Sequence, residues 1–136
     1  MPFVLDASVT LTWAFEDEVT PYTDRVLGRL DHDTALVPAI WPLEIANGAL
    51  AGERRQRLQP ADTSRFSALV QSLPIELDDM RLERTVGLVL DLARAHTLTT
   101  YDASYLELAM RAGLPLATQD ERLRAAAEQV GVPLAQ

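Results

Sequence analysis

The 136-residue chain contains no cysteine and no lysine, and it has only two histidines. Without cysteine there can be no disulfide, no thiolate metal site and no cysteine nucleophile. The absence of lysine removes every mechanism that needs a catalytic lysine. All twelve basic residues are arginines, which can still contact phosphate through two parallel hydrogen bonds. With only His32 and His96 available, a zinc site built on imidazole is not expected.

Long hydrophobic runs and positive charge are also scarce. No apolar run approaches the roughly 20 residues that a membrane-spanning helix needs. The first residues, Met1–Asp6, lack the basic region and apolar core of a signal peptide. We therefore expect a soluble, cytoplasmic protein. The net charge of −8 argues against a general binder of polyanions.

Short apolar runs alternate with longer amphipathic segments along one ordinary domain that we expect to span residues 1–136. Strands are expected at 3–5, 35–37, 75–77, 116–117 and 132–134. Helices are expected near 8–15, 21–30, 42–54, 61–72, 81–95, 102–112 and 119–129. This alternation predicts an α/β fold, with a parallel sheet of four to five strands and helices on both faces.

Several helix boundaries carry their own signals. Asp62 can cap the helix expected at 61–72, and Thr118 with Glu121 has the spacing of a capping box. Gly113 and Gly131 are each placed to end a helix.

Four carboxylates, those of Asp6, Glu44, Asp102 and Asp120, stand in apolar or helix-starting contexts where a charge is costly. Asp6 and Asp120 follow expected strands, and ligands of open α/β sheets bind at the carboxyl ends of strands. At least these two should therefore meet. Each aspartate alone has a structural explanation as a helix cap or as a partner of a helix dipole. Glu44 is harder to explain in this way, because it lies within an apolar segment and a lone buried carboxylate costs several kcal/mol.

Taken together, the four acids favour a metal site. Clustered carboxylates repel one another and raise a pKa, and a divalent cation removes that penalty. Ligation by oxygen alone selects Mg²⁺ or Mn²⁺ over zinc, and such an ion can activate water for attack on phosphorus. The remaining acids singled out are predicted to be solvated surface groups: Glu16, Asp17, Glu18, Asp31, Asp33, Asp78 and Asp79.

Four segments carry a family resemblance. Asp6–Ser8, Trp41–Asn47, Tyr101–Ala109 and Leu116–Leu123 resemble, in order and spacing, the acidic segments of PIN-domain ribonucleases. They are most similar to VapC-type toxins of bacterial type II toxin–antitoxin modules. The resemblance spans residues 3 to about 134. It implies a three-layer α/β/α PIN-like domain that cleaves RNA with Mg²⁺ or Mn²⁺.

The resemblance also assigns roles to residues. Asp6, Glu44, Asp102 and Asp120 match the catalytic, metal-binding acids. Ser8 and Thr118 match hydroxyl residues that accompany the first and last acids, although either could equally be a helix cap. Asn47 stands one helical turn from Glu44, where it could hydrogen-bond the acids.

Substrate and partners follow from the same resemblance. It implies a homodimer and a cognate VapB-type antitoxin whose tail covers the active-site groove. Trp13, Phe15 and Trp41 are candidates for apolar contact with a partner, or are simply core residues. The RNA is expected to be a structured component of the translation machinery, cut in an unpaired loop. Candidate phosphate contacts are Arg54, Arg55, Arg57, Arg122 and Arg124, although the first three could instead complement a helix C-terminus.

Two other functions fit parts of the sequence. One is a PIN-like binding module without catalysis. The other is an aspartyl-phosphate phosphatase, because Leu5–Thr10 is similar to a phosphate-accepting loop after a first strand. That class of enzyme relies on a lysine that this chain lacks, and its loop requires an acid at the position of Ser8.

Overall fold

The sheet consists of four parallel strands. The computed structural model describes all residues, 1–136. In the sheet order β3-β2-β1-β4, the strands are β1 (Phe3–Leu5), β2 (Ala35–Pro38), β3 (Ile75–Asp78) and β4 (Leu116–Ala117). The expected α/β fold is therefore confirmed. The fifth strand expected at 132–134 is reduced to one bridge between Leu116 and Leu134.

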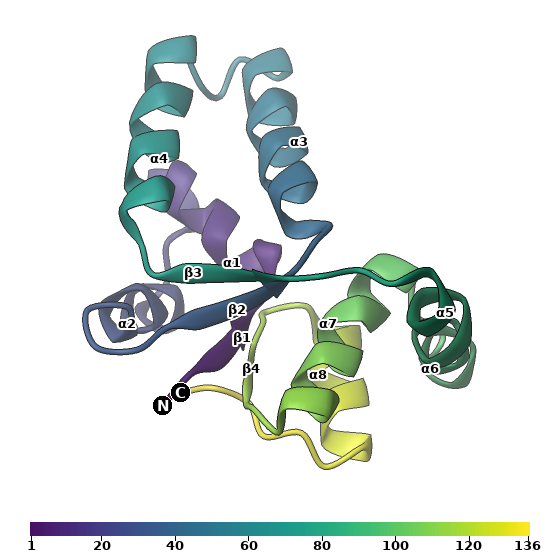
Figure 1. Cartoon of the computed structure of the whole chain (residues 1–136). Coiled ribbons are helices and arrows are strands. Elements are labelled where there is room, and N and C mark those ends of the chain that lie inside the picture. Colours follow the sequence, from purple (N-terminus) through teal and green to yellow (C-terminus); the bar gives the residue numbers. More distant parts are fainter.

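Helices flank this sheet and complete a three-layer α/β/α arrangement. Figure 1 shows α3 and α4 side by side above β3, whereas α7 and α8 lie together below it. None of the helices is both long and apolar enough to cross a bilayer. The helices are α1 (Ala7–Thr10), α2 (Pro21–Arg29), α3 (Trp41–Arg54), α4 (Pro60–Ser72), α5 (Leu82–Arg84), α6 (Leu90–His96), α7 (Thr100–Ala112) and α8 (Glu121–Gln129).

Strand β1 and helix α7 lie at the centre of the core. All three residues of β1 are fully buried, because the strand has neighbours on both edges and helices on its faces. Helix α7 lies against β1, β2 and β4, and every residue from Ala103 to Ala109 is buried. The site-bearing helix is thus held in place by burial along most of its length.

Two expected helices are less regular than the sequence suggests. The segment expected as one helix at 8–15 is the single turn α1 followed by a 3₁₀ turn over Leu11–Ala14. The helix expected at 81–95 is interrupted by a π-helical turn over Thr85–Val89, between α5 and α6. Such turns add or remove a residue from the hydrogen-bonding pattern, which apolar periodicity alone does not reveal.

Helix ends follow the glycine signals more closely than the polar ones. Gly113 ends α7 with a φ of +66°, and Gly131 follows α8 with a φ of +76°. Asp62 is not the cap of α4. It stands at the third helical position, where it accepts a hydrogen bond from the backbone N–H of the capping residue Gln59 at 2.8 Å.

Candidate functional site

The register of the sheet brings the ends of β1 and β4 together. Leu5 pairs with Ala117, so Asp6 and Thr118 emerge side by side at the carboxyl edge of the sheet. The Thr118 hydroxyl donates to Oδ2 of Asp6 at 2.7 Å. From the first turn of α1, the Ser8 hydroxyl donates to the same oxygen at 2.6 Å. Both predicted hydroxyl residues therefore contact the first acid.

The fourth acid is the cap of the last helix. The carboxylate of Asp120 accepts from the backbone N–H of Leu123 at 2.9 Å through Oδ1. The predicted capping box of Thr118 with Glu121 is therefore wrong, because the hydroxyl of Thr118 is directed to Asp6 instead. The Thr118 hydroxyl also accepts a hydrogen bond from the backbone N–H of Asp120 at 3.1 Å. Thr118 therefore connects Asp6 with the turn that carries Asp120.

Two helices supply the remaining acids. Glu44 lies in the first turn of α3, and Asp102 lies in the first turn of α7. One turn beyond Asp102, the fully buried Tyr105 donates its hydroxyl hydrogen to Oε1 of Glu44 at 2.6 Å. The same hydroxyl accepts from the backbone N–H of Ala7 at 3.4 Å. Tyr105 thus links the three segments that carry Asp6, Glu44 and Asp102.

Tyr105 is a residue of the site that was not predicted from the sequence. A signal was present in its spacing, because residues three apart in a helix face the same side, and Tyr105 follows Asp102 by three. A buried tyrosine also requires a partner for its hydroxyl. What the sequence could not supply was the identity of that partner, which lies 61 residues away.

All four acids line one cavity of about 300 Å³. Its other lining residues are Ala7, Ser8, Leu11, Asn47 and Gly48. Gly48 permits the close approach of the segment after α1, since a Cβ there would lie 2.5 Å from Cδ2 of Leu11. Asn47 reaches the cavity, as expected, but forms no hydrogen bond with an acid in this structure. We refer to this site, bounded by Asp6, Glu44, Asp102 and Asp120, as the acid cavity.

Burial and mutual repulsion raise the pKa of three carboxylates in this cavity, those of Asp6, Glu44 and Asp102. Burial raises the pKa of Asp6, although hydrogen bonds from Ser8 and Thr118 counteract the shift. Burial raises the pKa of Glu44 as well, with further contributions from the charges of Asp6 and Asp102. For Asp102, burial followed by repulsion from Asp6 and Asp120 raises the pKa to about 6. No arginine lines the cavity to offset these charges.

The donor set suits a small divalent cation. Every polar side chain that lines the acid cavity offers oxygen, four of them as carboxylates, which is the chemistry that Mg²⁺ and Mn²⁺ prefer. No three acids are grouped closely enough to form a ready-made cage. Mg²⁺ is usually held by one or two carboxylates and several waters, each of roughly 30 Å³, so the cavity has room for such an ion. The residues therefore fit the metal that the resemblance implies.

The predicted phosphate-binding arginines do not line the acid cavity. Arg54 and Arg55 are exposed at the end of α3, about 15 Å along the helix from Glu44 at 1.5 Å per residue. Arg57 is paired with Asp17 and Glu18 and lies over the ring of Phe15.

At the start of α8 the two predicted arginines differ. Arg122 is exposed, whereas Arg124 donates to the backbone carbonyl of Thr118 at 3.1 Å. Contact of these arginines with RNA stays a prediction. Of the aromatic candidates for partner contact, Trp41 and Phe15 are buried and Trp13 is half-buried, so the core explanation accounts for them.

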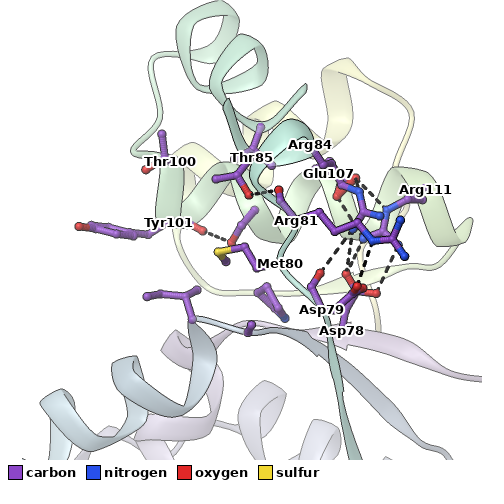
Figure 2. Close-up of a pocket in the computed structure, with 15 residues that line it drawn as sticks. Asp78, Asp79, Met80, Arg81, Arg84, Thr85, Thr100, Tyr101, Glu107 and Arg111 are labelled. Carbon is purple, nitrogen blue, oxygen red and sulfur yellow. Dashed lines mark hydrogen bonds and ion pairs between the residues drawn. The ribbon is translucent and has the colours of Figure 1, made fainter. Parts of the chain in front are cut away.

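A second carboxylate cluster lies further along α7. Figure 2 shows Asp78 and Glu107 facing Arg84 and Arg111 beside a separate cavity of about 130 Å³. Arg111 binds Glu107 at 2.8 Å and Asp78 at 2.5 Å, and Arg84 lies 3.6 Å from each acid. We refer to these four residues as the ion-pair cluster. The prediction that Asp78 is a solvated surface group is wrong, because these arginines and the end of β3 half-bury it.

Comparison with known proteins agrees with this geometry. The family described as "PIN domain" matches residues 3–129. Among solved structures, PAE2754 from Pyrobaculum aerophilum is similar, with 28% sequence identity and a TM-score of 0.68 over 93% of this chain and 79% of that chain. A comparison with curated proteins finds no match.

Proposed function

This chain belongs to the PIN domain family, generally a nuclease fold, and on that premise we propose that it is an Mg²⁺- or Mn²⁺-dependent endoribonuclease. One observation supports the proposal above the others. Four carboxylates from four separate segments converge on one cavity, and none of them pairs with an arginine. Buried and half-buried acids without a counter-charge are costly, and such a cost is typical of functional sites.

Each group of the cavity has a distinct task in this proposal. Asp6, Glu44, Asp102 and Asp120 would share the cation, one or two of them in direct contact and the others through its water ligands. When bound, the cation supplies Lewis acidity and lowers the pKa of water at the site. Ser8 and Thr118 fix the carboxylate of Asp6 from one side, because both hydroxyls donate to Oδ2.

The acids also govern access to the site. Without a cation, their combined charge repels the phosphates of RNA, and the repulsion falls when the charge is neutralised. RNA therefore binds productively only to the loaded enzyme. Asn47, at the wall of the same cavity, is placed to hydrogen-bond substrate rather than the acids.

We propose further that the chain is a VapC-type toxin that cleaves a structured RNA of the translation machinery and is neutralised by a VapB-type antitoxin. An antitoxin arginine entering the acid cavity would provide the missing counter-charge. The groove between α3 and α4, of about 380 Å³ and lined by Ile45, Leu50 and Val70 among others, offers an apolar surface for the rest of such a tail. A homodimer is supported by the exposed side chains of Leu82, Val86 and Leu88, which are 75%, 58% and 61% exposed.

Expression in bacteria tests this function. The wild-type chain should arrest growth, and new 5′ ends should appear at few positions in cellular RNA within minutes of induction. Asp6→Asn at matched protein level should do neither, and co-expression of a short protein encoded beside the gene should restore growth. Arrest that persists at full strength with Asp6→Asn, without new 5′ ends, would instead indicate a binding module that sequesters a partner.

A further inference from the structure

Three of the four acids have one carboxylate oxygen already occupied by the protein. Both hydroxyls that contact Asp6 donate to Oδ2. The Tyr105 hydroxyl occupies Oε1 of Glu44, at 2.6 Å. The Leu123 N–H occupies Oδ1 of Asp120, at 2.9 Å. Each of these three carboxylates is therefore left with one oxygen that has no partner in the protein.

This pattern bears on which cation the site accepts. Ca²⁺ takes six to eight oxygens and often binds a carboxylate through both of them. Mg²⁺ requires six ligands in near-octahedral positions at 2.0–2.1 Å, which suits carboxylates that each offer a single oxygen. An arrangement that occupies one oxygen in three of the four acids therefore disfavours the larger ion.

The orientation of the Glu44 carboxylate depends on a single hydrogen bond. Asp6 is held by two hydroxyls and Asp120 by its own helix, whereas the Tyr105 hydroxyl is the only protein donor to the Glu44 carboxylate. A glutamate has more rotatable bonds than an aspartate, and without that contact it can swing to present both oxygens. The tyrosine itself cannot move, because its ring is fully buried and its hydroxyl also meets the N–H of Ala7.

We propose that Tyr105 is a positioning residue that determines metal specificity: it holds Glu44 as a one-oxygen ligand and so selects small six-coordinate cations over Ca²⁺. The inference rests on the proposed function, because it presumes that the acid cavity binds a cation. It adds that the selection is made by a phenol that does not itself bind the ion.

The test compares two tyrosines that each lose one hydroxyl. In Tyr105→Phe the ring stays and only the contact with Glu44 and Ala7 is lost. In the control Tyr22→Phe, the hydroxyl lost is one that donates to the backbone carbonyl of Ala135 at 3.0 Å. Dissociation constants for Mn²⁺ alone and Ca²⁺ alone are measured by calorimetry on metal-free protein, and the melting temperature in EDTA reports folding.

We expect wild type and Tyr22→Phe to bind Mn²⁺ more tightly than Ca²⁺, with the same ratio of constants. Removing a group that orients a metal ligand typically costs 10- to 100-fold in affinity, so Tyr105→Phe should weaken Mn²⁺ binding by about tenfold or more. Ca²⁺ binding should change much less, so the preference for Mn²⁺ should shrink. In a Glu44→Gln background, Tyr105→Phe should cause no further loss.

Each contrary result has a definite meaning. If Tyr105→Phe melts at a lower temperature but keeps wild-type constants for both ions, the hydroxyl is merely structural and the inference is wrong. Tyr105→Phe could also lower Mn²⁺ affinity by the same factor in the wild-type chain and in the Glu44→Gln background. That result would contradict an action through Glu44. A wild-type chain that binds neither ion would overturn the proposed function itself.

Discussion

Helix α7 carries two carboxylate clusters that are opposites in charge balance. At its first turn, Asp102 joins Asp6, Glu44 and Asp120 in the acid cavity, where no arginine is present. In its middle, Glu107 is 5% exposed, about as hidden from solvent as Asp6 at 4%, but lies between Arg84 and Arg111. Buried charge alone therefore does not mark a functional site in this protein. The feature that marks the functional site is a group of carboxylates without a counter-charge.

The two clusters should contribute to stability with opposite sign. In the ion-pair cluster every carboxylate is paired with a guanidinium, and removing one partner leaves the charge of the other uncompensated. In the acid cavity, unpaired carboxylates repel one another, so replacing one of them relieves strain in the metal-free protein.

The largest expected difference is in activity. Asp6→Asn, Glu44→Gln and Asp102→Asn should each lower the rate of RNA cleavage about a thousandfold, which corresponds to about 4 kcal/mol of transition-state stabilisation. Glu107→Gln should stay within a few-fold of wild type, because its carboxylate faces arginines rather than the cavity. Cleavage of a fluorescent RNA by purified proteins measures both. A folded but inactive Glu107→Gln protein would show that the two clusters are not functionally distinct.

The second largest expected difference is in how much Mn²⁺ raises the melting temperature of variants in the two clusters. Mn²⁺ at a hundred times its dissociation constant stabilises the native state by about 2.7 kcal/mol, and we expect a corresponding rise in melting temperature for wild type. Glu107→Gln should show the same increment from a lower starting temperature, whereas Asp6→Asn should show little or none. Differential scanning fluorimetry with and without EDTA provides the measurement. Equal increments in the two variants would place the metal outside the acid cavity.

In the absence of metal, substitution of Glu107 should lower the free energy of unfolding more than substitution of Asp6. Glu107→Gln should lower the free energy of unfolding by about 1–3 kcal/mol, because Arg111 and Arg84 lose a charged acceptor in a half-buried position. Asp6→Asn should leave it unchanged or raise it, since one repelling charge is removed. Urea denaturation in EDTA is the appropriate assay. Loss of stability in Asp6→Asn as large as that in Glu107→Gln would mean that the hydrogen bonds from Ser8 and Thr118 to Asp6 outweigh the repulsion between the acids.

The smallest effect concerns pH. The pKa of Asp102 is raised from 3.8 to about 6, so between these values the native state holds a proton that the unfolded state has released. Native stability must then fall as pH rises through this window. We expect metal-free wild type to melt at a higher temperature at pH 5 than at pH 7, and this difference to shrink in Asp102→Asn. Saturating Mn²⁺ should cancel or reverse it, because the ion binds the deprotonated acids.

Much of the fold could be predicted from sequence because apolar periodicity reports burial directly. The four strands were expected at or within a residue of their actual positions, and Gly113 marked the end of α7 correctly. The π-helical turn at Thr85–Val89 was missed because apolar periodicity does not reveal a change from i→i+4 to i→i+5 hydrogen bonds. The isolated bridge at Leu134 shows that a short apolar run is compatible with a strand without requiring one.

Within the site, predictability depended on distance along the chain. In a parallel sheet the residues that follow neighbouring strands meet at one edge, so the meeting of Asp6 with the residues after β4 could be anticipated from topology. The contact from Tyr105 to Glu44 joins two helices whose relative rotation no local pattern specifies. Glu107 and Arg111 have helical i, i+4 spacing, but spacing alone does not show that the carboxylate of this pair is buried.

Crystals of the wild-type chain grown with Mn²⁺ and measured at the manganese absorption edge test the central claim most directly. We predict an anomalous peak in the acid cavity, within bonding distance of the Asp6 carboxylate, and none beside Glu107 and Arg111. The same peak should be absent from crystals of Asp6→Asn. An acid cavity without a peak at saturating Mn²⁺, or a peak that survives Asp6→Asn unchanged, would contradict the account.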